Sequence, residues 1–252
     1  MPSGQAKPQD EIVQQEKGAV MNRRHKIIAG LFAVLAASPM ALQGTASAIV
    51  NGSDAKSLPP GMVEVRSDKG GCGGTLISPD WVLTAVHCLL AGHPTAIRIG
   101  SKGRDMGDWK YSQKDYIHEG TDIALLKLSA GDVTLPYKDL SEFAQIKSTD
   151  PAVKSRLYVY GWGTTETGNV SPTLKWAEVA VTGTDCHDVG GGPAICSTPV
   201  TGYTGTGDSG GPLYDQNMHV AGVVSSGFSG GRTQYGSVAN SWDWIVHTMV
   251  NP

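Results

Sequence analysis

The sequence lacks the features that would place the chain in a membrane, on a nucleic acid or around a metal ion. Its one long uncharged apolar run, Ile27–Ala37, is much shorter than the ~20 residues that a membrane-spanning helix needs. The 20 lysine and arginine residues are balanced by 23 aspartate and glutamate residues and form no extended basic patch. None of the four cysteines has the CxxC or His-x-Cys spacing typical of metal ligands. We therefore expect no membrane anchor, no nucleic-acid partner, no metal and no cofactor.

The front of the chain has the layout of a segment that is removed rather than folded. A basic cluster at Arg23–Lys26 precedes the apolar run, and the small residues Ala46–Ala48 follow it as a cleavage signal. This order predicts a leader and secretory signal peptide over residues 1–48, and a secreted, extracellular domain over residues 49–252. The alternative is a buried N-terminal helix, in which case the basic cluster and the cleavage signal would be coincidental. The role of residues 1–20 stays open.

The composition of residues 49–252 favours an all-β fold. The chain has 33 glycines, few helix-forming runs, and recurring segments rich in valine, isoleucine and threonine between turn signals. The expected strands are 73–77, 82–85, 96–99, 123–128, 157–160, 174–181, 213–214 and 220–225. Segment 241–250 differs, because Trp242, Ile245, Val246 and Met249 recur at helical spacing and predict an amphipathic helix. We expect one domain made of two subdomains that divide roughly at residues 129–156.

The cysteines are Cys72, Cys88, Cys186 and Cys196. An even number in a chain with a predicted signal peptide favours disulfides over free thiols. Three connectivities are possible, and pairs that are neighbours in the sequence would close the shortest loops. Closing a loop of about 15 residues stabilises a fold by roughly 3 kcal/mol in the chain-entropy description.

Three polar residues lie in local sequences that suit nucleophilic catalysis. Ser209 lies within Gly207–Pro212, His87 lies within Thr84–Cys88, and Asp122 begins an apolar segment. A serine hydroxyl is a weak nucleophile at neutral pH and needs a base, which an imidazole supplies when a carboxylate fixes its tautomer. Glycines around the serine would let backbone N–H groups approach a developing oxyanion. The three residues therefore predict a catalytic triad.

The order of these residues along the chain separates two classes of hydrolase. A Gly-x-Ser-x-Gly segment also fits the nucleophile elbow of α/β-hydrolases, in which the serine comes first and the histidine last. Here His87 comes first, Asp122 second and Ser209 last. That is the order of the chymotrypsin-type triad.

Six ordered segments make the chain resemble the chymotrypsin-like (trypsin family) serine proteases. They are Ile49–Gly52, Trp81–Cys88, Asp122–Leu126, Gly161–Gly163, Gly207–Leu213 and Ser225–Gly227. The resemblance extends over almost all of residues 49–252 and implies two six-stranded antiparallel β-barrels with the active site between them. The predicted C-terminal amphipathic helix would follow the second barrel. The resemblance also implies the disulfide pairs Cys72–Cys88 and Cys186–Cys196.

The resemblance implies further roles around the triad. The glycines around the nucleophile leave the backbone N–H groups of Gly207 and Ser209 free to approach closely, so we expect these two to form the oxyanion hole. In this family the amino group of the mature first residue, here Ile49, pairs with the carboxylate before the nucleophile, here Asp208. Such pairing is physically reasonable because a buried carboxylate without a partner is costly. We expect activity to fall at alkaline pH as this amine loses its proton.

The position of the predicted cleavage signal bears on how this amine arises. Ala46–Ala48 directly precedes Ile49, so we infer that signal peptidase itself creates the activating terminus. The alternative is cleavage further upstream, for example after Ala41, which leaves a short propeptide for another protease.

The predicted specificity pocket departs from that of trypsins, which carry an aspartate six residues before the nucleophile. Tyr203 occupies that position here, and Thr201–Thr206 contains no carboxylate. A tyrosine on the pocket floor would favour small or apolar substrate side chains, unless the ring points elsewhere. Ser225 and Gly227 are expected to bind an extended substrate strand, and Thr233 is expected on the pocket wall.

These observations predict a secreted serine endopeptidase, acting on peptide or protein substrates through an acyl-enzyme intermediate. The alternatives are a catalytically silent binding module on the same fold, or an esterase. We expect a monomer, with protein inhibitors as further partners.

Overall fold

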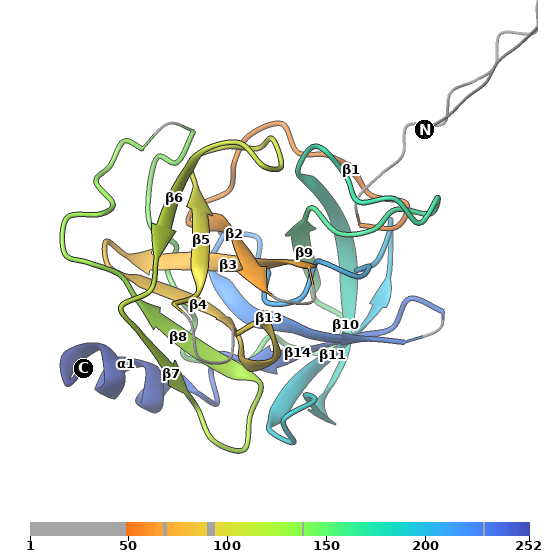
Figure 1. The fold of residues 1–252 in the computed structure, drawn as a ribbon. Helices are drawn as coiled ribbons and strands as arrows, with labels where there is room; N and C mark the ends of the chain where they lie inside the picture. The colour runs from red at the N-terminus through yellow and green to blue at the C-terminus, as the bar shows by residue number, and fades with distance from the viewer. Residues whose placement is uncertain (1–48, 68–69, 90–93, 138, 229) are drawn as a thin grey trace, which may run out of the picture. The chain divides into compact units, whose positions relative to one another are not determined.

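A computed structural model describes residues 49–67, 70–89, 94–137, 139–228 and 230–252 (Figure 1). The predicted leader, signal peptide and cleavage signal over residues 1–48 lie outside the described residues. Within the described residues the chain forms two antiparallel sheets and one α-helix. No helix in this part of the chain is both long enough and apolar enough to cross a membrane.

The second half of the chain forms a closed barrel of six strands. These are β9 (Arg156–Gly161), β10 (Lys175–His187), β11 (Pro193–Pro199), β12 (Pro212–Tyr214), β13 (Val220–Gly227) and β14 (Thr233–Ser237). The order β10-β11-β14-β13-β12-β9 is closed by pairing between β9 and β10, and the short β1 (Ser53–Asp54) also pairs with β10. In β9, Leu157 and Val159 are buried while Tyr158 and Tyr160 are only half-buried, as alternation along a strand requires.

The first half forms a sheet that curls into a half-barrel. Its strands are β2 (Met62–Ser67), β3 (Gly70–Ser78), β4 (Trp81–Ala85), β5 (Ala96–Ile99), β6 (Asp108–Tyr111), β7 (Lys114–Ile117) and β8 (Ile123–Lys127), in the order β6-β5-β2-β3-β4-β8-β7. The two outermost strands, β6 and β7, follow one another in the chain. Between them, the N–H of Ser112 donates to Thr95 at one edge and the N–H of Gln113 donates to Lys127 at the other.

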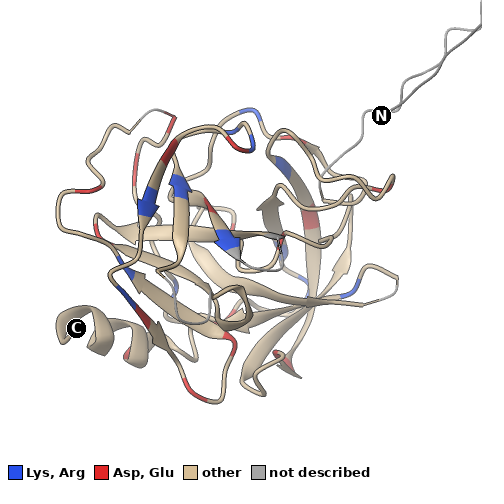
Figure 2. Cartoon of the chain, viewed as in Figure 1, with Lys and Arg blue, Asp and Glu red and all other residues tan. Residues whose placement is uncertain are grey.

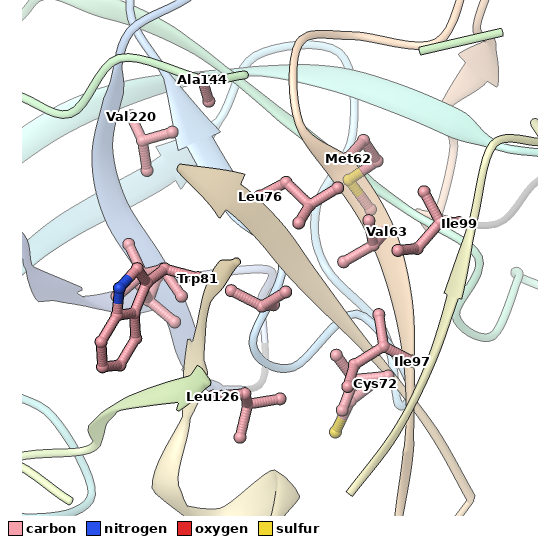
Figure 3. Close-up of a cluster of buried hydrophobic side chains, with 14 of the residues drawn as sticks. Met62, Val63, Cys72, Leu76, Trp81, Ile97, Ile99, Leu126, Ala144 and Val220 are labelled. Atoms are coloured by element: carbon pink, nitrogen blue, oxygen red, sulfur yellow. The ribbon is translucent and has the colours of Figure 1, made fainter. Parts of the chain in front are cut away.

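The expected two-barrel architecture is thus confirmed, with a difference in strand count. The first sheet has seven strands among the described residues rather than six. The segment from β6 to β7 counts as two strands, because its first part pairs with β5 and its second part pairs with β8. Buried aliphatic side chains of β2, β3, β5 and β8 meet in its interior, and Figure 3 shows Met62, Val63, Leu76, Ile97 and Leu126 among them. Burial of such side chains is the main driving force for this fold.

The predicted C-terminal helix is present as α1 (Trp242–Val250), next to β7 in Figure 1. It follows the second barrel in the chain but packs on the first sheet. The ring of Trp244 stacks on His118, just after β7, with 4.7 Å between ring centroids. Nδ1 of His118 also lies 3.0 Å from the hydroxyl of Ser241.

Candidate active site

His87 lies in a short 3₁₀ turn, Val86–Cys88, that follows β4 directly. The adjacent Cys88 forms a disulfide with Cys72 of β3, with 6.2 Å between the two Cα atoms. The turn is therefore tied covalently to the sheet, while the His87 side chain remains 33% exposed. The imidazole is held in place and is still accessible to a substrate.

Asp122 lies just before β8, and its side chain is only 2% exposed. Its Oδ2 lies 2.8 Å from Nδ1 of His87, and its Oδ1 accepts the backbone N–H of His87 at 3.1 Å. An ionised carboxylate can only accept hydrogen bonds, so Nδ1 must carry the proton in this pair. The other ring nitrogen, Nε2, is then free to accept a proton from a nucleophile.

Ser209 lies in the turn before β12 and is bound to both sheets through its backbone. Its carbonyl accepts the N–H of Gly73 in β3 at 2.7 Å, and the N–H of Gly210 donates to Val224 of β13 at 2.8 Å. A Cβ on Gly210 would overlap the hydroxyl of Thr84 and lie 3.2 Å from the nitrogen of Ala85, two residues before His87.

These contacts bring the segment of Ser209 to the end of β4, where the turn with His87 begins. The hydrogen bonds among the described residues include none between the Ser209 hydroxyl and the His87 ring. That contact stays a prediction from the sequence.

The two predicted oxyanion donors have no hydrogen-bond acceptor among the described residues. Gly207 has a φ of 97°, a conformation that glycine adopts without strain. Within the described part of the chain, neither the N–H of Gly207 nor that of Ser209 donates a hydrogen bond to another residue. Two unpaired donors next to a nucleophile can stabilise a negatively charged oxygen.

Asp208 is fully buried and has no cation beside it among the described residues. Its Oδ1 accepts the N–H of Gly163 at 2.8 Å, and its Oδ2 accepts the N–H of Gly205 at 2.7 Å. Burial raises the pKa of this carboxyl group to about 7, and the two backbone hydrogen bonds oppose the increase. Among the residues that the structure describes, only backbone N–H groups thus compensate for the burial of this carboxyl group.

Ile49, the predicted partner, is also buried, and its segment runs close to the same carboxylate. The carbonyl of Val50 accepts the N–H of Tyr203 at 3.0 Å. Tyr203 is two residues before Gly205, which donates to Asp208. In the uncut chain the nitrogen of Ile49 is a peptide nitrogen, because residue 48 precedes it.

A cavity of about 380 Å³ opens beside Ser209. The described residues of its walls carry no charged side chain. They are Val50, Thr164, Tyr203, Thr204, Gly205, Thr206, Ser209, Val224, Ser225, Ser226, Gly227 and Phe228. Tyr203 packs against Gly231, where a Cβ would lie 2.6 Å from Cδ1 of its ring. Three of the predicted pocket residues, Tyr203, Ser225 and Gly227, thus line one cavity.

Thr233, the fourth predicted pocket residue, does not line this cavity. It is buried behind the wall, where its hydroxyl lies 2.9 Å from the hydroxyl of Thr204. Thr233 belongs to β14, and its side chain supports the wall residue Thr204 instead of reaching the cavity. The prediction for this residue is corrected accordingly.

One residue of the site was missed by the sequence analysis. Asp188 is buried, and its Oδ2 accepts the backbone N–H of Asp122 at 2.9 Å. The only sequence feature near Asp188 is the run Gly190–Gly192 that follows it, and such a run is typical of an ordinary turn. The loop lies between Cys186 and Cys196, which form the second disulfide.

Both disulfides have the pairing that the resemblance implied. Within the described residues, no group of three or more His, Cys, Asp or Glu side chains is arranged to hold a metal ion.

Comparison with known proteins adds to this geometry. A family model described as trypsin matches residues 49–245. The chain is 33% identical over 199 residues to Trypsin 5G1 of Aedes aegypti, covering 69% of this chain and 73% of the relative. It is 30% identical over 223 residues to Trypsin iota of Drosophila melanogaster, covering 79% of this chain and 87% of the relative.

A solved structure of human heparin binding protein aligns with a TM-score of 0.69 and 23% identity, covering 81% of this chain and 98% of that chain. At that identity the likeness concerns the fold.

Proposed function

Because the chain belongs to the trypsin family of serine endopeptidases, we propose that it cleaves peptide bonds through an acyl-enzyme formed on Ser209. Nε2 of His87 takes the hydroxyl proton as the serine oxygen bonds to the substrate carbonyl carbon, and it then donates that proton to the leaving amine. Water then gives a proton to the same nitrogen as its oxygen bonds to the ester carbon. The bond from that carbon to the serine oxygen breaks, the serine oxygen takes the proton back from Nε2, and the acid is released. Asp122 holds the ring and stabilises the imidazolium formed in each half-reaction.

The observation that carries this proposal is the pairing of His87 with a buried carboxylate. The 2.8 Å contact between Nδ1 and Oδ2, with the second oxygen on the backbone N–H of the same histidine, fixes both the orientation and the tautomer of the ring. A base that requires no reorientation supports general base catalysis. The unpaired N–H groups of Gly207 and Ser209 support a role as the oxyanion hole.

The cavity beside Ser209 supports a preference for uncharged substrate side chains. A lysine or arginine side chain would lose its hydration there without meeting a carboxylate, which is costly. The ring of Tyr203 offers apolar contact to a small or medium-sized side chain. The substrates are peptides or proteins, and protein inhibitors that enter the same cavity are proposed as further partners of a monomeric enzyme.

We further infer that Ile49 and Asp208 form the activating pair and that the protein acts outside the cell. A buried carboxyl group with a pKa raised to about 7 is suited to receive the new amine that cleavage before Ile49 would release. N-terminal sequencing of the secreted protein tests whether this cleavage occurs. Any start other than Ile49 would reject direct activation by signal peptidase.

Labelling with a serine-directed fluorophosphonate tests the triad. We expect the protein to be labelled on Ser209 and the Ser209→Ala variant to remain unlabelled. A folded protein that is not labelled would indicate a binding module on this fold. Comparing turnover of matched peptide and ester substrates distinguishes the endopeptidase from an esterase.

A further inference from the structure

The loop between the second pair of cysteines packs directly on the backbone of the proposed catalytic aspartate. In this loop, Gly190 and Gly192 lie so close to Thr121 that side chains would not fit. A Cβ on Gly190 would overlap the Thr121 carbonyl and lie 2.7 Å from the nitrogen of Asp122, and one on Gly192 would lie 2.7 Å from Cγ2 of Thr121. The close approach requires glycine at both positions.

Asp188 uses its two oxygens for different purposes. Oδ1 accepts the N–H groups of Gly190 and Gly192, both at 2.9 Å, and this fixes the carboxylate within its own loop. Oδ2 accepts the N–H of Asp122 at 2.9 Å. The carboxylate therefore links a loop of the second barrel, just after β10, to the start of β8 in the first sheet.

The same loop also controls the hydroxyl that contacts Asp122 from the other side. The N–H of Val189 donates to Oγ of Ser225 at 3.1 Å. Because that oxygen accepts from Val189, its own proton is directed to Oδ2 of Asp122, at 2.7 Å. Asp122 is thus held at its backbone by Asp188 and at its carboxylate by a hydroxyl that the next residue orients.

Gly236 of β14 has no side chain, and the Asp188 carboxylate lies in the space where one would stand. A Cβ there would lie 3.2 Å from Oδ2 of Asp188 and 3.1 Å from Cγ1 of Ile123. A side chain at this position would crowd the carboxylate against the start of β8.

We propose that Asp188 is a positioning residue, which fixes the peptide of Asp122 and through it the orientation of the His87 ring. This inference rests on the proposed function, since it concerns the same triad. Asp188 contacts neither substrate nor the reacting atoms. Its loss would change the rate of the chemical step and leave substrate binding almost unaltered.

The experiment compares three variants of the full protein. Asp188→Asn offers a single acceptor oxygen, which cannot serve both the loop glycines and Asp122. Asp185→Asn is the matched control, because it removes the same charge from an exposed position on the same hairpin. Gly236→Ala keeps every polar group and only crowds the carboxylate.

We expect Asp188→Asn to lower kcat by about 10- to 100-fold, the range that small misplacements of catalytic groups produce. KM should stay within about threefold, and Asp185→Asn should match the parent protein. The deshielded NMR signal of the proton between His87 and Asp122 should shift or broaden in Asp188→Asn but not in Asp185→Asn. Gly236→Ala should show a smaller loss of kcat of the same kind, and it carries the test if Asp188→Asn does not fold.

A folded Asp188→Asn or Gly236→Ala variant with parental kcat and an unchanged proton signal would overturn the inference. The NMR signal needs a folded His87–Asp122 pair but no turnover. It therefore tests Asp188 even if the parent protein proves inactive toward fluorophosphonate and peptides, a result that would reject the proposed function instead.

Discussion

The hydroxyl of Ser225 donates to Oδ2 of Asp122 at 2.7 Å, the same oxygen that lies 2.8 Å from Nδ1 of His87. The carboxylate is therefore held between a hydroxyl from the second barrel and an imidazole from the first sheet. Hydrogen bonds to charged groups contribute about 1.5–3 kcal/mol, so this contact helps to hold the carboxylate in position.

Ser225→Ala should lower kcat by about tenfold, because the buried carboxylate loses one donor and the histidine loses part of its orientation. Ser226→Ala is the matched control: this neighbouring serine also lines the cavity, but its hydroxyl bonds to Gln234 at 2.9 Å. Steady-state kinetics on one peptide substrate measure both variants. Equal effects on kcat would show that the contact with Asp122 has no special role.

Asp208 makes the stability of the uncut chain depend on pH. Its pKa is raised from 3.8 to about 7 by burial, so the folded state prefers the neutral acid. Ionising this buried group lowers the free energy of unfolding. The loss is absent below about pH 4, increases between pH 4 and 7, and reaches about 4 kcal/mol above pH 7.

A protein that keeps residues before Ile49 should thus lose unfolding free energy between pH 4 and 7, and one that starts at Ile49 should lose less because its amine is protonated there. Urea unfolding at several pH values measures the difference. Asp208→Asn in the extended protein should remove the additional pH dependence. If the unfolding free energy changed equally with pH in all three proteins, Asp208 would not be the source of this pH dependence.

Gly210→Ala should destabilise the protein and abolish labelling of Ser209. The φ of Gly210 is 75°, and a Cβ would overlap the Thr84 hydroxyl and lie 2.5 Å from the carbonyl oxygen of Gly73. Gly168→Ala is the control, since Gly168 has a φ of 79° with nothing within 4 Å of a Cβ. The control should lose only the ~1–2 kcal/mol of the left-handed conformation.

The clash at Gly210 should add about 1–3 kcal/mol to that loss. Thermal unfolding of both variants gives the comparison. A Gly210→Ala protein as stable and as reactive as Gly168→Ala would mean that this turn does not pack as described.

The uncharged cavity predicts that kcat/KM will be lower for peptides with Arg or Lys before the cleaved bond than for matched peptides with Ala or Leu. Tyr203→Asp should improve cleavage after Arg and Lys, because it places a carboxylate in the cavity wall. Tyr203→Asn should not improve this cleavage, because asparagine has the size of aspartate but carries no charge. Profiling a peptide library with the three proteins tests this, and a parent preference for basic residues would refute it.

Strands with clear apolar patterns could be predicted from the sequence. The expected segments 82–85 and 123–128 correspond to β4 and β8, and the expected helix corresponds to α1. β6 and β7 were not predicted, because their residues DWKY and KDYI are mostly polar and lie on an exposed surface. Each pairs with a strand close by in the sequence, β6 with β5 and β7 with β8, but no apolar run marks them as strands.

β2 was missed for a different reason. Its Glu64 is buried, which breaks the expected pattern, and ion pairs with Arg66 at 3.3 Å and Arg104 at 3.5 Å make this burial possible. Figure 2 shows basic residues on β2, β5 and β6. Arg66 lies two residues away in the same strand, but Arg104 lies 40 residues away, and no local rule identifies that second partner.

The site also contains residues that the sequence could predict and residues that it could not. His87, Asp122 and Ser209 could be proposed from short motifs, since each motif is contiguous. Asp188 could not, because its role depends on one backbone N–H that lies 66 residues away in the sequence. Thr233 was misplaced because the path of the chain before β14 cannot be inferred from spacing alone.

The stacking of Trp244 on His118 has a consequence for how the molecule is made. The surface around β7 receives its cover from residues that are synthesised after every strand of both sheets. Until those later residues have been synthesised, the part of this surface that Trp244 covers stays open to water. Completion of the first sheet's surface therefore depends on a helix that follows the second barrel in the chain.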